Sequence, residues 1–200
     1  MKLNSANRIT ILRILLIVPF VICMLDVNDP ATGTTKRYIA LVLFFIMAFS
    51  DAYDGYVARK KKQVTKLGSF LDPMADKILM ACACVLLSVD KTDVHGFQLP
   101  PTVVVLIIGK DLFALLGFVI LYFLTMQVKI IPAFIGKVAT VLQISMVAAI
   151  LMAPEVSSAL PGWIWFVKFL WWSAAITAII ATLIYIRAGT RYIEQFENNK

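Results

Sequence analysis

Long apolar runs separated by short polar segments dominate the pattern of residues along this chain. A helix that crosses a bilayer needs about 20 mainly apolar residues. Turn-forming segments such as "DVNDPATGTT", "DKTDVHGFQLP" and "APEVSSALPG" separate several runs of that length. The pattern predicts an all-α integral membrane protein, with residues 1–8 starting a short N-terminal interfacial helix. Six transmembrane helices are expected, over residues 9–27, 37–58, 67–89, 101–126, 132–153 and 163–187.

Composition supports a membrane protein with a single domain over residues 1–200. Of the 200 residues, 60% are hydrophobic and the mean hydropathy is +0.85, whereas soluble domains are about 45–50% apolar. The net charge of +7 fits loop topology and anionic lipid better than nucleic acid. The three cysteines, Cys23, Cys82 and Cys84, lie in apolar runs without the spacing of a zinc or redox site.

The distribution of basic residues predicts how the chain is oriented in the membrane. The link between the second and third spans is basic, whereas the longer polar loops hold few Lys or Arg. The positive-inside rule then places this link and both termini in the cytoplasm. We expect a protein of the cytoplasmic (inner) membrane, or an equivalent membrane, with its active site at the cytoplasmic face. The basic residues behind this orientation are Lys2, Arg8, Arg59, Lys60, Lys61, Lys62, Lys66, Arg187 and Arg191.

Four aspartates flank that basic link. Asp51 and Asp54 are three residues apart, and Asp72 and Asp76 are four apart, so each pair shares one helix face. The short link makes the second and third spans antiparallel neighbours, which brings both acidic faces to one membrane depth. Four carboxylates in one cleft repel one another, and two divalent cations would cancel their charge. Hard oxygen ligands suit Mg²⁺ or Mn²⁺.

The four aspartates are also compatible with two roles outside catalysis. They could form structural ion pairs with Lys77 and Arg59, although four carboxylates at helical spacing on adjoining spans are unusual for that role. The chain could instead be a non-enzymatic divalent-cation transporter, because membrane-embedded carboxylates are typical of ion pathways. A pathway would need polar residues through the full membrane depth, whereas these acidic pairs lie near one face.

The spacing of the region resembles a known family signature. It reads D-x2-D-G-x2-A-R-x8-G-x3-D-x3-D and resembles the CDP-alcohol phosphotransferase (CDP-alcohol phosphatidyltransferase) family at every fixed position. The matching residues are Asp51, Asp54, Gly55, Ala58, Arg59, Gly68, Asp72 and Asp76. The segment "NRITILR", with Asn7, Thr10 and Arg13, and the segment "GKVATVLQ", with Gly136, Lys137, Thr140 and Gln143, are also similar to family segments.

The resemblance implies an enzyme of phospholipid biosynthesis that works in the lipid bilayer. It would transfer the phosphatidyl group of CDP-diacylglycerol to an alcohol and release CMP. By the family pattern, Asp51, Asp54, Asp72 and Asp76 bind two Mg²⁺ or Mn²⁺ ions, and Asp76 is also the general base. The family is commonly homodimeric. The residues that would line the CDP site are Gly55, Ala58, Arg59, Gly68 and Thr10.

The acceptor alcohol is less clearly indicated. Family members that use glycerol 3-phosphate usually carry an Arg-Glu pair in the fourth span and a further arginine after it. This chain has Lys110-Asp111 and Phe118 instead. Members that use phosphatidylglycerol and make cardiolipin have a basic-Asp pair and lack the second arginine. We expect glycerol 3-phosphate, with phosphatidylglycerol as the alternative. The candidates for binding the acceptor phosphate are Lys110, Lys137 and Lys129.

Overall fold

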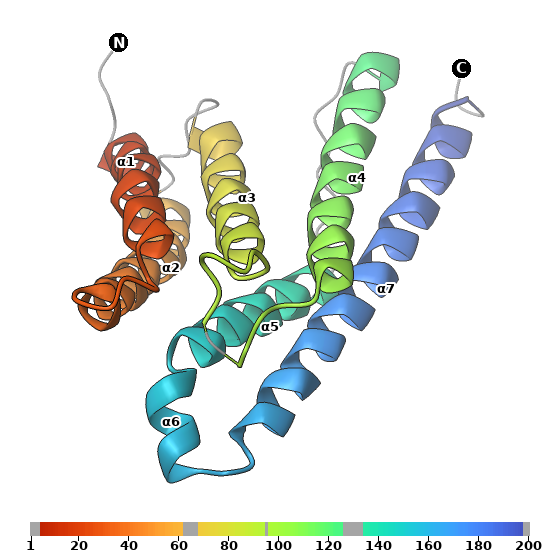
Figure 1. Cartoon of the computed structure of the whole chain (residues 1–200). Coiled ribbons are helices and arrows are strands. Elements are labelled where there is room, and N and C mark those ends of the chain that lie inside the picture. The colour runs from red at the N-terminus through yellow and green to blue at the C-terminus, as the bar shows by residue number, and fades with distance from the viewer. Residues whose placement is uncertain (1–4, 62–67, 95, 126–133, 198–200) are drawn as a thin grey trace. The chain divides into compact units, whose positions relative to one another are not determined.

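The computed structural model describes residues 5–61, 68–94, 96–125 and 134–197. For residues 5–9, 51–61, 68–73, 118, 120–125, 192–193 and 195–197 it describes the helical backbone alone. Across the described residues the fold is all-α, as the apolar pattern predicts (Figure 1). The helices are α1 (Ser5–Leu25), α2 (Gly33–Lys61), α3 (Gly68–Leu86), α4 (Pro101–Thr125), α5 (Phe134–Leu151), α6 (Ala153–Ala159) and α7 (Trp163–Glu197).

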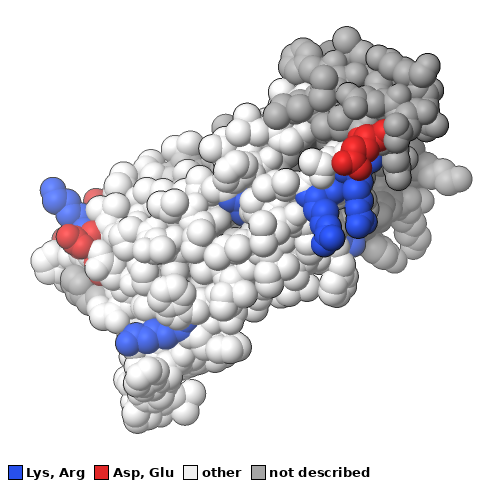
Figure 2. Space-filling view, turned by 90° about the vertical axis from the view of Figure 1, so that its right-hand side faces the viewer, with Lys and Arg blue, Asp and Glu red and all other residues white. Residues whose placement is uncertain are grey.

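The described residues contain three helices that are long and apolar enough to cross a bilayer. These segments are Gly33–Ser50 of α2, Phe134–Leu151 of α5 and Trp163–Arg191 of α7. Thr10–Leu25 of α1 is a shorter apolar helix. Large apolar side chains are exposed along these helices, among them Leu15, Phe49 and Trp165. Uncharged surface also dominates the face shown in Figure 2. Such a surface fits hydrocarbon rather than water, so this is a membrane protein.

Two helices differ from the sequence expectation. The separate interfacial helix over residues 1–8 is wrong for residues 5–8, because these continue directly into α1. No glycine or proline stands between Ser5 and Val18 to break the helix there. The short helix α6 lies within a segment that we expected to be a turn. Pro154 at the start of α6 and Glu155 in its first turn both favour a helix N-terminus.

The chain divides into two compact units. The first comprises residues Met1–Leu99 and Val147–Val167, and the second Pro100–Met146 and Lys168–Lys200. In the first unit, α1 packs against both α2 and α3. Phe20 of α1 meets Phe44 of α2, with ring centroids 6.2 Å apart. This unit carries all four aspartates of the motif.

A buried arginine joins the start of α2 to the α6 region within the first unit. Arg37 is 7% exposed. It donates hydrogen bonds to the Leu151 carbonyl at 2.6 Å and to Glu155 Oε2 at 2.7 Å, and a further one to Glu155 Oε1. The Tyr38 hydroxyl donates to the same carboxylate at 2.7 Å. Because a fork of two guanidinium hydrogen bonds fixes both partners, this contact holds α6 on α2.

Candidate active site

The buried faces of α1, α2 and α3 form the frame of the candidate site. On each helix the buried residues recur at intervals of three and four, which is one stripe of an α-helix. On α1 the stripe includes two polar residues, Thr10 and Arg13, both only 1% exposed. The buried stripes are Thr10, Arg13, Ile17, Phe20 and Met24 on α1, Ala40, Phe44 and Met47 on α2, and Ala75, Leu79, Met80, Ala83 and Cys84 on α3.

The aspartates lie on helices at the ends of these stripes. The same three-and-four spacing, carried on from Met47 of α2, reaches positions 51 and 54. Asp72 and Asp76 belong to the first half of α3. The Asp76 side chain is half-buried. The side chains of Asp51, Asp54 and Asp72 lie outside the described residues, so their ligand roles stay a prediction.

Of the CDP-binding candidates, the structure describes the side-chain surroundings of Thr10 alone. Thr10 is buried on α1, in the unit that carries the aspartates. Gly55, Ala58 and Arg59 lie on the last turns of α2, and Gly68 begins α3. Their side-chain surroundings lie outside the described residues, as does the link over residues 62–67. The helical backbone on both sides of that link is nevertheless what the motif spacing requires.

The donor set fits a divalent metal chemically. Four carboxylates offer only hard oxygen ligands, which suit Mg²⁺ and Mn²⁺. The one carboxylate of the set whose side chain is described, Asp76, is half-buried on α3. The chemistry of the donor set agrees with a cation at this end of α2 and α3.

The acceptor candidates belong to the second unit. Lys110 of α4 is 5% exposed, and its Nζ lies 3.2 Å from Asp111 Oδ1. Adjacent residues of a helix point to different sides, but the long lysine side chain reaches the neighbouring carboxylate. Lys137 lies near the start of α5 and is exposed. Lys129 lies outside the described residues.

The segment around Lys137 shows a close contact that sequence reasoning missed. The Tyr185 hydroxyl of α7 lies against Gly136 of α5, where an added Cβ would be 2.3 Å from the oxygen. Thr140 Oγ1 donates to the Gly136 carbonyl at 3.1 Å. Gln143 is 1% exposed, and its Nε2 has no hydrogen-bond partner within the described part of the chain. Tyr185 gave no signal in sequence, since a tyrosine in an apolar run resembles ordinary packing.

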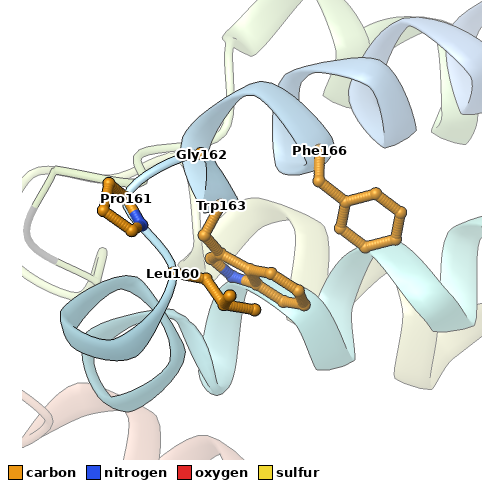
Figure 3. Close-up of a pocket in the computed structure, with 5 residues that line it drawn as sticks. All are labelled: Leu160, Pro161, Gly162, Trp163 and Phe166. Atoms are coloured by element: carbon orange, nitrogen blue, oxygen red, sulfur yellow. The ribbon is translucent and has the colours of Figure 1, made fainter.

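A shallow pocket at the turn from α6 to α7 is apolar. Leu160, Pro161, Gly162, Trp163 and Phe166 line it, with a volume of about 340 Å³ (Figure 3). The ring centroids of Trp163 and Phe166 lie 5.0 Å apart. Since its lining offers no acid, base or metal ligand, this pocket is not a place for group transfer.

Comparison with known proteins decides the family. A family model described as CDP-alcohol phosphatidyltransferase matches residues 3–186. The chain belongs to this family. The match spans the whole aspartate motif and confirms the resemblance seen in sequence. The protein is therefore an enzyme, a phosphatidyltransferase of phospholipid biosynthesis.

Several relatives of this phosphatidyltransferase share one name, "CDP-diacylglycerol--glycerol-3-phosphate 3-phosphatidyltransferase". The one from Bacillus subtilis (strain 168) is 35% identical over 157 residues, covering 74% of this chain and 77% of the relative. The one from Rickettsia bellii (strain RML369-C) is 29% identical over 193 residues, covering 94% and 97%. The one from Haemophilus influenzae (strain ATCC 51907 / DSM 11121 / KW20 / Rd) is 42% identical over 88 residues, covering 44% of each chain.

Proposed function

We propose that this enzyme transfers the phosphatidyl group of CDP-diacylglycerol to glycerol 3-phosphate, giving phosphatidylglycerophosphate and CMP. The observation that carries the proposal is the name of its relatives, one of which aligns over 94% of this chain and 97% of its own length at 29% identity. That choice agrees with the acceptor preferred on sequence grounds.

In the proposed reaction, an acceptor hydroxyl oxygen forms a bond to the phosphorus of the phosphatidyl group. The phosphorus–oxygen bond to the CMP phosphate breaks, and CMP leaves with that electron pair. The Asp76 carboxylate takes the hydroxyl proton, a role that needs only hydrogen-bond reach. Asp51, Asp54, Asp72 and Asp76 would hold two Mg²⁺ or Mn²⁺ ions, which supply electrostatic stabilisation of the diphosphate when bound.

Further side chains would position the substrates. The CDP moiety would contact the end of α2 and the start of α3, through Gly55, Ala58, Arg59 and Gly68, with Thr10 nearby on α1. Lys110, Lys137 and Lys129 would bind the acceptor phosphate. The Lys110–Asp111 contact lowers the net charge that Lys110 offers, so the exposed Lys137 is the stronger candidate of the two described lysines.

The finer topology is also part of this proposal. Six spans, with both termini and the link over residues 62–67 on the cytoplasmic side, would place the aspartates at the cytoplasmic face. The acyl chains of the donor could then stay in the leaflet while its headgroup reaches the site. We propose a single catalytic domain over residues 1–200 that works in the cytoplasmic membrane as a homodimer.

A screen of acceptors tests the function. Purified protein would receive labelled CDP-diacylglycerol, Mn²⁺ or Mg²⁺, and glycerol 3-phosphate, phosphatidylglycerol, inositol or serine in separate reactions. We expect phosphatidylglycerophosphate with glycerol 3-phosphate alone. Cardiolipin from phosphatidylglycerol, with glycerol 3-phosphate ignored, would instead establish the alternative that Asp111 and Phe118 favour. A product from inositol or serine would refute both acceptors.

A further inference from the structure

A buried arginine on α1 has no role in the proposed chemistry. Arg13 is 1% exposed and belongs to the largest fully buried side chains among those that the structure describes. A guanidinium stays charged in proteins, and burying a charge is costly unless an opposite charge compensates it. Among residues 10–25 of α1, the buried stripe around Arg13 is otherwise apolar, apart from Thr10. The sequence of α1 contains no Asp or Glu, so an opposite charge for Arg13 has to come from another part of the chain.

The contact between α1 and α2 indicates where that compensation lies. Phe20 meets Phe44, and the short turn after Leu25 sends α2 back along α1 (Figure 1). Arg13 is seven residues before Phe20, and position 51 is seven residues after Phe44. Seven residues are two turns, or about 10.5 Å. In antiparallel helices the two displacements run the same way, so Arg13 reaches the level of position 51.

The same register places Thr10 at the level of position 54. Thr10 is three residues before Arg13, as Asp54 is three residues after Asp51. The polar part of the α1 stripe therefore runs beside the part of α2 that carries the first aspartate pair. Above this level, towards Phe20 and Phe44, both stripes are apolar.

We propose that Arg13 is a built-in counter-charge of the aspartate cluster, placed beside Asp51, and that it competes electrostatically with bound divalent metal. The proposal rests on the proposed metal site. Without metal, the guanidinium offsets part of the carboxylate repulsion and holds α1 on α2. With metal bound, the same guanidinium opposes the cations but leaves the site more positive for an anionic diphosphate. Arg13 is thus a positioning residue, one that sets the charge of the site.

The first test is thermal unfolding of the full-length protein in detergent with a chelator. We expect Arg13→Gln to lower Tm in the parent by at least about 3 °C more than it does in the Asp51→Asn background, where its charge partner is already gone. Arg13→Lys should keep most of the Tm, whereas Arg13→Met, which keeps the bulk but not the charge, should not. An equal effect of Arg13→Gln on Tm in both backgrounds, or a Tm that Arg13→Met keeps at the parent value, would overturn the assignment. Arg13 would then act through packing.

The second test uses Mn²⁺ alone as the probe. In Arg13→Gln, the Mn²⁺-induced rise in Tm should be larger than in the parent, and half-maximal stabilisation should need at least about threefold less Mn²⁺. The matched control is Arg37→Gln, which removes a buried guanidinium at the opposite end of α2. It should lower Tm but leave the Mn²⁺ response unchanged. An unchanged or weaker Mn²⁺ response in Arg13→Gln would refute the competition.

These tests separate this inference from the proposed function. If the parent makes phosphatidylglycerophosphate and responds to Mn²⁺, but Arg13→Gln behaves as Arg37→Gln does, only the role of Arg13 fails. If the parent shows neither activity nor a Mn²⁺ response, the proposed function fails. The coupling between Arg13 and Asp51 in chelator still decides whether the two charges interact.

Discussion

The contact between Gly136 and Tyr185 predicts that Gly136→Ala destabilises the parent protein but stabilises a Tyr185→Phe variant. A Cβ at position 136 would lie 2.3 Å from the Tyr185 hydroxyl oxygen and 3.5 Å from Cζ of the same ring. The first distance is a severe clash, and the second is ordinary van der Waals contact. Gly136→Ala should therefore be costly while the hydroxyl is present and harmless once it is removed.

The magnitudes follow from two opposing effects. Overpacking in a well-packed region costs about 1–3 kcal/mol, whereas alanine improves on glycine in a helix by up to about 1 kcal/mol. Gly136→Ala should then destabilise the parent by roughly 0–2 kcal/mol. In the Tyr185→Phe background it should stabilise by up to about 1 kcal/mol, because only the helix effect remains.

Thermal unfolding of the four proteins of this cycle is the assay. For a chain of this size, 1 kcal/mol corresponds to about 2–4 °C in Tm. Gly109→Ala is a control, because a Cβ there meets no atom within 4 Å. Equal effects of Gly136→Ala in both backgrounds would refute the reasoning, since the clash with the hydroxyl would then not exist.

Three further predictions concern the acidic residues and the topology. Arg37 and Tyr38 lower the pKa of Glu155 from 4.5 to about 2. The ionised carboxylate therefore stabilises the fold fully above about pH 4.5, and this stabilisation is lost as the pH falls towards 2. The Tm advantage of the parent over Glu155→Gln should shrink over that range, and a constant advantage would contradict it. Asp76→Asn should still bind CDP-diacylglycerol and Mn²⁺ but turn over at least about 10²-fold more slowly, and a rate within a few-fold of the parent would place the base elsewhere. With the native cysteines replaced, Lys62→Cys and Lys91→Cys should react with impermeant thiol reagents from opposite sides of the membrane. Reaction of both cysteines from the same side would refute the topology.

The sequence predicted the helical framework well, because apolar runs bounded by turn residues specify membrane helices almost directly. It failed where the chain has no strong periodicity. The segment containing α6 is only a few residues long and rich in small and turn-forming residues. Arg37 was not recognised as a fixing residue because its partner, Glu155, is 118 residues away. No local pattern reveals such a pair.

In the candidate site, local spacing predicted the acidic residues, whereas residues whose surroundings depend on tertiary packing were missed. Its aspartates were predicted from carboxylates at fixed helical spacings, and the family match confirmed the family, while the ligand roles of the aspartates stay a prediction. Tyr185 was missed because its environment depends on how α5 and α7 pack. The acceptor lysines depend on tertiary surroundings in the same way. Lys110 is buried beside a carboxylate, whereas Lys137 is exposed. Both lysines lie in apolar runs, so the sequence alone does not predict this difference.

Arg13 changes the electrostatic reasoning that first suggested two metals. Four carboxylates alone would be neutralised by two divalent cations, which leaves no net attraction for a diphosphate. If Arg13 lies beside the four carboxylates as proposed, these five side chains together would carry a net charge of −3, and two divalent cations would bring them to +1. A site with net positive charge favours the anionic diphosphate of the donor. It also favours the departing CMP as negative charge develops on its phosphate. A buried arginine beside the metal ligands would therefore weaken metal binding, yet serve the reaction by keeping the loaded site positive.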